Sequence, residues 1–291
     1  MRECFRKSSL PFFALGMLFA ACAGRRSVIL EPLAVAVPNP TAAAILRAEA
    51  DKLWQQRDDP QKARQALATY QQAFAANPVD VALGTRLARA YHFVASYIET
   101  KPEAQDTLFQ RGVETGERTL ALNSNFRMIY QKTREESKAL AALDKSWVNP
   151  IYWTGANLEG WTKRQGQWVR YGNKHVVEAY FTRLRELEPN LFYGAVYRFF
   201  GALPTQVPFG SLDESKREFE KAIEVAPKFL GNYRAYAENY AVARKDRDLF
   251  KKLLLRAING NPKALPDVSP ENKFEQAIAK KMLDEIDKYI K

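Results

Sequence analysis

Apolar residues recur with helical spacing almost everywhere from residue 42 to the end of the chain, and no stretch shows the strict alternation of a half-buried strand. The final segment is the clearest example, because its apolar residues fall at intervals of four and so share one helix face. They are Phe274, Ile278, Met282, Ile286 and Ile290. This pattern predicts an all-α fold with a single helical domain over residues 42–291.

Helix starts are marked by residue types that satisfy the free backbone N–H groups of a first turn. A capping side chain followed directly by proline is one such signal, and a capping box is another. The first signal occurs at Asp59-Pro60, Asn149-Pro150 and Ser269-Pro270, and Ser211 with Glu214 makes a capping box. We therefore expect helices to begin at these four places.

A degenerate repeat is visible in several of these segments. The second helix of a tetratricopeptide repeat has a small residue, then an aromatic residue, a second small residue and a terminating proline at fixed intervals. That pattern fits Ala66, Tyr70, Ala73 and Pro78, and again Ser215, Phe219, Ala222 and Pro227, with looser matches ending at Pro189 and Pro262. We predict a degenerate tetratricopeptide-like helix-turn-helix array, or α-solenoid, with an irregular middle between about residues 130 and 170.

The N-terminus has the layout of an export signal. A basic start, a short apolar run and small residues lead to Cys22. The apolar run is too short to span a bilayer. Phe19-Ala20-Ala21-Cys22 resembles a bacterial lipobox, which implies lipidation of Cys22; an ordinary secretory signal is the alternative. We expect residues 1–21 to be a lipoprotein signal peptide and residues 22–41 a lipidated, proline-containing tether. Ala23 after the cysteine favours a periplasmic protein anchored to the outer membrane.

The formal net charge of +11 would ordinarily suggest a nucleic-acid partner. An exported protein rarely meets nucleic acid, so we expect none, and an acidic protein or anionic lipid is the better candidate. A solvated surface is the more common explanation, since basic and acidic residues are mixed along most helices.

The irregular middle is unusually rich in aromatic residues, with Trp147, Trp153, Trp161 and Trp168 in a short stretch. Large aromatic side chains mostly pack in cores, and this interpretation carries about twice the weight of ligand contact. An aromatic cavity with a few polar groups is nevertheless typical of a small-molecule site. The candidate ligand-contact residues are Trp147, Tyr152, Trp153, Asn157, Trp161, Tyr193, Tyr197 and Phe200.

Ordered sequence blocks in residues 120–290 resemble the TRAP transporter T-component family. The blocks are Pro-Ile-Tyr-Trp from Pro150, Glu-Pro-Asn then Tyr-Gly from Glu188, Asp-Glu-Ser with Phe-Glu-Lys-Ala from Asp213, and Asp-Arg-Asp-Leu-Phe from Asp246. The resemblance implies a periplasmic lipoprotein with tetratricopeptide-like repeats that pairs with the solute-binding protein of a tripartite ATP-independent periplasmic (TRAP) transporter. It also implies a homotrimer and a channel or pocket for an apolar or organic-acid ligand.

An organic acid would need a basic partner, and the cations nearest the aromatic residues are Lys163, Arg164 and Arg170. Their interpretation as ordinary solvated charges is about three times more common.

Motifs for catalysis are absent from the sequence. The two histidines, His92 and His175, stand alone, and there is no HExxH, GxSxG or GxGxxG pattern. We therefore expect no catalysis, no metal site and no cofactor. The alternative function, supported by the repeats and the anchor alone, is a scaffold lipoprotein for envelope or outer-membrane assembly.

Overall fold

The structure is a computed structural model that describes residues 27–31, 37–207 and 209–290. Within these ranges the chain forms helices and no strand, which confirms the predicted all-α fold. Cys22 and the predicted signal peptide lie outside the described residues. No helix in the described ranges is long and apolar enough to cross a bilayer.

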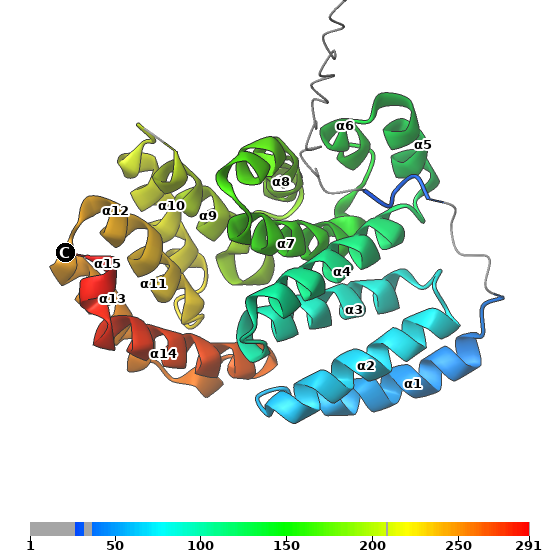
Figure 1. The fold of residues 1–291 in the computed structure, drawn as a ribbon, viewed down its shortest axis with the longest axis horizontal. Helices are drawn as coiled ribbons and strands as arrows, with labels where there is room; N and C mark the ends of the chain where they lie inside the picture. Colours follow the sequence, from blue (N-terminus) through cyan, green and yellow to red (C-terminus); the bar gives the residue numbers. More distant parts are fainter. Residues whose placement is uncertain (1–26, 32–36, 208, 291) are drawn as a thin grey trace, which may run out of the picture.

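The first half of the molecule consists of antiparallel helix pairs (Figure 1). The helix α1 packs on α2, and α4 lies between α3 and the aromatic helix α7. A π-helical segment, η1 (Val94–Ile98), continues α3, and the 3₁₀ turn η2 (Lys145–Trp147) precedes α7. The helices are α1 (Pro40–Trp54), α2 (Pro60–Ala76), α3 (Val81–Phe93), α4 (Pro102–Leu120), α5 (Ser124–Thr133), α6 (Glu136–Leu140) and α7 (Val148–Arg164).

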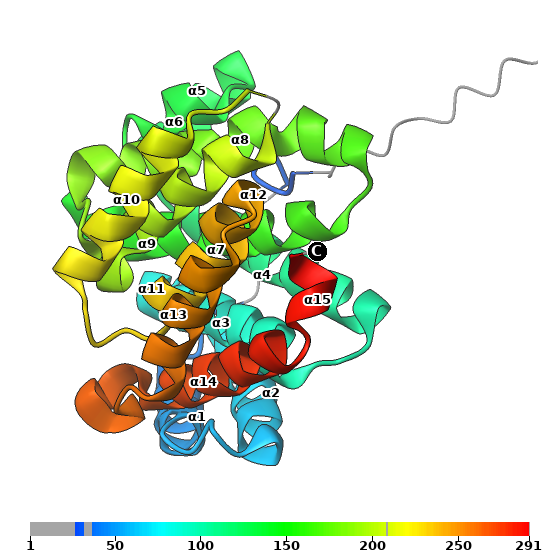
Figure 2. The same ribbon diagram turned by 90° about the vertical axis from the view of Figure 1, so that its left-hand side faces the viewer.

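The second half continues the arrangement and curves back toward the first (Figure 2). Here α9 pairs with α10, and α13 packs against both α11 and α14. Short 3₁₀ turns follow α9 (η3, Leu203–Gln206) and α13 (η5, Pro262–Ala264; η6, Pro266–Val268), and the π-helical η4 (Ala237–Ala241) follows α11. The helices are α8 (Gln167–Leu187), α9 (Leu191–Ala202), α10 (Leu212–Val225), α11 (Gly231–Tyr236), α12 (Val242–Arg244), α13 (Arg247–Ile258), α14 (Ser269–Asp284) and α15 (Ile286–Tyr289).

Two of the four predicted helix starts form their capping hydrogen bonds. The Asp59 carboxylate accepts from the backbone N–H groups of Gln61 and Lys62, and the Ser211 hydroxyl accepts from the N–H of Glu214. Asn149 and Ser269 are already helical, because α7 begins at Val148 and α14 begins at Ser269 itself. The proline therefore lies in the first turn of each helix, although no side chain caps either one.

Residues of the predicted repeat pattern lie in the core. Ala66, Ala73, Phe219 and Ala222 are completely buried, and Tyr70 is almost so. Small residues at these positions let neighbouring helices approach closely, as a helix-pair array requires. The tetratricopeptide-like repeat itself stays a prediction.

The two halves are joined by buried ion pairs that reach from α14 to the N-terminal helices. Glu271 on α14 accepts from Arg57, in the turn between α1 and α2, at 2.6 Å, and from Arg89 on α3 at 3.0 Å. The side chain of Arg57 also donates to the backbone carbonyl of Asp267. We call Arg57, Arg89 and Glu271 the α14 clasp.

A second set of buried polar contacts lies one turn farther along α14. The Glu275 carboxylate accepts from the Tyr97 hydroxyl at 2.8 Å and from the Arg234 guanidinium at 2.6 Å. Burial alone would raise the pKa of Glu275, but Arg234 outweighs it and holds that pKa below its ordinary value. Glu275 is therefore charged at neutral pH and links η1 to α11.

Part of the predicted tether packs against the helical domain. Ile29 is fully buried and Val28 is nearly so, and the backbone N–H of Val28 donates to Glu117 on α4 at 2.9 Å. Arg118 forms an ion pair with Glu31 beside them at 2.6 Å. Residues 27–31 are thus held on the surface of α4.

Candidate ligand cavities

Half of the predicted ligand-contact residues are core residues of α7. Tyr152, Trp153 and Trp161 expose between 4% and 6% of their surface, and Asn157 exposes none. The Asn157 amide donates to the carbonyl of Ala88 on α3 at 2.9 Å and to that of Trp153 at 2.7 Å. Asn157 therefore joins α7 to α3, and its side-chain NH₂ group is used in holding these two helices together.

The other four predicted residues are partly buried and lie in different places. Trp147 packs at the edge of the core, and the ring of Tyr193 stacks on Phe229 with the centroids 5.5 Å apart. The Tyr197 hydroxyl donates to Asn190 at 3.3 Å, and the Arg185 guanidinium covers the ring of Phe200. The structure does not gather the eight residues around one described cavity.

A left-handed turn fixes the aromatic cluster at the start of α9. Phe192, Tyr193 and Gly194 have φ values of 42°, 57° and 79°, and such backbone costs free energy for residues other than glycine. Arg198 supports the turn by donating to the carbonyl of Tyr193 at 2.7 Å and to that of Phe192 at 3.3 Å. The turn directs Phe192 against Tyr152 and Trp153 of α7.

Trp153 lines a cavity of about 490 Å³ between α1–α3 and the start of α7. Trp54, Tyr70, Arg86 and Arg89 also line it. Each arginine is already paired, Arg86 with Asp51 and Arg89 with Glu271. The positive charge offered to an anionic ligand in this cavity is therefore largely neutralised.

A second cavity of about 410 Å³ lies between α7, α8 and the end of α9, and we call it the Arg170 cavity. Val177, Phe199 and Leu203 form its apolar wall. Thr162 on α7 also lines it, and its hydroxyl is buried with no hydrogen-bond partner in the described part of the chain. A buried donor without a partner costs free energy that a bound ligand would recover.

The predicted basic residues divide between this cavity and the surface. Lys163 and Arg170 line the Arg170 cavity, whereas Arg164 is bound to Asp106 at 2.5 Å. Lys163 pairs with Glu159 at 2.7 Å. Within residues 37–207 and 209–290, Arg170 forms no ion pair, so its charge is available.

Sequence reasoning missed Thr162, Val177, Phe199 and Leu203 as cavity residues. A usable signal was present in α8, where the lining residues share one helix face at intervals of three and four. They are Gln167, Arg170, Tyr171, Lys174 and Val177. Tyr171 is also 78% exposed, which is unusual for a large aromatic side chain.

His92 packs edge-on between Phe109 and Trp153, with ring centroids 5.7 and 5.6 Å away. Burial lowers its pKa from 6.5 to about 4. Between pH 6.5 and about pH 4, His92 is therefore protonated in the unfolded chain but neutral in the folded protein. The folded state loses stability as the pH falls through this range.

We expect His92 to account for a loss of about 2 kcal/mol in unfolding free energy between pH 7 and pH 5. Urea unfolding at the two pH values measures the loss, and His92→Phe should reduce it by that amount. An unchanged pH dependence in His92→Phe would contradict this assignment.

A metal ion would need several His, Cys, Asp or Glu side chains close together. In the described ranges, no three His, Cys, Asp or Glu side chains come together as they would around a metal ion.

Comparison with known proteins identifies the family. The family model of the TRAP transporter T-component matches residues 56–290, nearly the whole chain. No curated protein matches the chain. The match confirms the resemblance of the ordered blocks, and it makes the protein an accessory component of a TRAP transporter. The chain therefore belongs to the TRAP transporter T-component family.

Proposed function

We propose that this protein binds an organic acid with an apolar body in the Arg170 cavity and docks the solute-binding protein of its transporter. The same proposal includes a lipid anchor at Cys22 in the outer membrane, a periplasmic position and assembly as a homotrimer. The lipobox and the family membership support the anchor, the position and the trimer.

The observation that carries the ligand proposal is the combination of groups in the Arg170 cavity. Its volume of about 410 Å³ falls in the range of small-molecule sites, which are mainly apolar with a few polar groups. The unpaired Arg170 suits a carboxylate, because a guanidinium can donate two parallel hydrogen bonds to it. Rotation of the Thr162 side chain would bring its buried hydroxyl to the cavity as a further donor, and Phe199 and Val177 suit an apolar chain or ring.

Isothermal titration of the full-length protein in detergent with a panel of mono- and dicarboxylic acids tests this proposal. We expect one class of acid to bind, and Arg170→Gln to weaken its binding by about ten- to a hundredfold, because a charge-assisted hydrogen bond is lost. Val177→Trp should abolish binding by filling the cavity.

Arg217→Gln is the matched control, because Arg217 is an exposed cation on α10 that does not line the cavity. It should bind the acid as the wild type does. Equal affinity in Arg170→Gln and the wild type, or failure of every acid to bind, would contradict the ligand proposal.

A further inference from the structure

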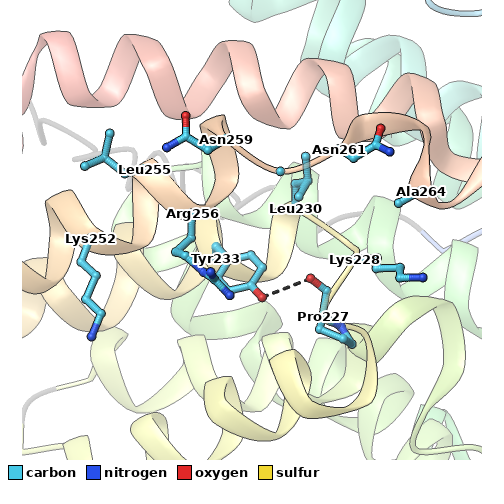
Figure 3. Close-up of a pocket in the computed structure, with 11 residues that line it drawn as sticks. Pro227, Lys228, Leu230, Tyr233, Lys252, Leu255, Arg256, Asn259, Asn261 and Ala264 are labelled. Carbon is cyan, nitrogen blue, oxygen red and sulfur yellow. Dashed lines mark hydrogen bonds between the residues drawn. The ribbon is translucent and has the colours of Figure 1, made fainter.

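An open groove of about 710 Å³ lies on the second half of the molecule, between α11, α13 and the turn that follows α13 (Figure 3). Lys252 and Arg256 come from one face of α13, and Lys228 comes from the segment between α10 and α11. All three side chains are exposed to solvent. We call this the basic groove.

Within the described part of the chain, the charges of the basic groove are not balanced by carboxylates. No aspartate or glutamate lines the groove, and Lys228, Lys252 and Arg256 form no ion pair in the described ranges. Cations elsewhere on the surface commonly pair with a carboxylate, as Lys216, Lys221 and Lys280 do. An acidic ligand would therefore meet positive charge that has no competing partner.

The lining also contains apolar residues, among them Leu230 and Leu255, and further polar groups. The Tyr233 hydroxyl donates to the carbonyl of Pro227 at 3.1 Å, and Arg256 lies over the Tyr233 ring, 5.8 Å from its centroid. The side-chain amides of Asn259 and Asn261 lie along the opposite side (Figure 3). Amide side chains can both donate to and accept from a peptide backbone.

The spacing of the cations indicates an elongated ligand. In Figure 3, Lys252 stands at one end of the groove, Arg256 in the centre and Lys228 at the other end. A single small anion requires donors that converge on one point, whereas an extended acidic segment places carboxylates at intervals. The open shape and the row of cations favour the segment.

We propose that the basic groove is the docking site for an acidic segment of the solute-binding protein. This inference rests on the proposed function, because it assigns a surface to the docking step. Complementary charge would speed the encounter of the two proteins and make their association sensitive to salt.

The test uses the full-length, lipidated protein as bait in a native envelope extract. The solute-binding protein that is recovered is identified by mass spectrometry, purified, and titrated against wild-type and variant bait at low and high salt. The groove variant combines Lys228→Glu, Lys252→Glu and Arg256→Glu.

The control variant combines Arg111→Glu, Arg127→Glu and Lys132→Glu on α4 and α5, which changes the net charge equally. Circular dichroism checks that both variants fold. We expect the groove variant to bind at least a hundredfold more weakly, and the control variant to bind within about threefold of the wild type.

Three other outcomes would each contradict a specific part of the proposal. Equal binding by both variants would overturn the basic groove and leave the proposed docking intact. If wild-type bait recovers no solute-binding protein, the docking part of the proposed function fails, and the groove assignment fails with it. If the groove variant loses only binding to phosphatidylglycerol vesicles, the groove faces a membrane and the inference is wrong.

Discussion

Replacing Glu271 by alanine is expected to lower the free energy of unfolding by about 3 to 5 kcal/mol. Glu271 is 3% exposed and is the carboxylate shared by both arginines of the α14 clasp. Its removal leaves the charge of Arg57, which is 4% exposed, without a carboxylate partner in the core. The cost of an unpaired buried charge is far larger than the net value of the ion pair. Chemical denaturation followed by circular dichroism measures the change.

The matched control is Glu220→Ala, because Glu220 is exposed and lies 3.8 Å from Lys216 one helical turn away. Surface pairs of this kind contribute less than about 1 kcal/mol. Hydrogen exchange adds a local readout, since loss of the clasp should speed exchange in α14 before it does so in α7. A change below 1 kcal/mol in Glu271→Ala, with exchange in α14 unaltered, would refute the role of the clasp.

The clasp also marks what the sequence could not predict. Local patterns predicted the features that depend on neighbours within a few residues. These are the caps at Asp59 and Ser211 and the burial of Phe219 and Ala222. Arg57 and Glu271 are 214 residues apart in the chain. Their meeting depends on the summed curvature of every helix pair between them, which no local pattern contains.

The candidate site stays a prediction. The aromatic composition of residues 147–200 offered ligand contact as the lesser alternative to core packing, and Lys163 and Arg170, named there as basic partners, line a cavity. The composition favoured core packing in general, but it could not show which of the aromatic residues, here Tyr152, Trp153 and Trp161, face the core. Which side of α7 is buried depends on where α4 crosses it, and two glycines on α4 determine that crossing.

Those glycines, Gly112 and Gly116, are one helical turn apart and face α7. A Cβ atom at Gly116 would clash with the hydroxyl oxygen of Thr154 and lie 2.9 Å from its Cβ and 3.1 Å from its Cα. A Cβ atom at Gly112 would clash with the side-chain amide of Asn157. The backbones of α4 and α7 can approach this closely because neither position carries a side chain.

We expect Gly116→Leu to lower the free energy of unfolding by about 3 kcal/mol, the upper end of the usual cost of overpacking, since the added side chain must push α4 away from α7. Denaturant unfolding measures the loss. Trp153 directly precedes Thr154 on α7, so displacement of α7 should weaken the near-ultraviolet circular dichroism of the folded variant.

Gly172→Leu is the control that separates packing from helix propensity. Gly172 lies in the interior of α8 with nothing within 4 Å of its Cβ position. Leucine is a better helix former than glycine by roughly 0.5 to 1 kcal/mol, so this variant should be slightly more stable than the wild type. The same substitution is therefore expected to change stability in opposite directions at two helical glycines. If Gly116→Leu is also neutral or stabilising, the close approach of α4 and α7 does not determine how α7 is buried, and the aromatic core must be fixed by the left-handed turn at Phe192–Gly194 instead.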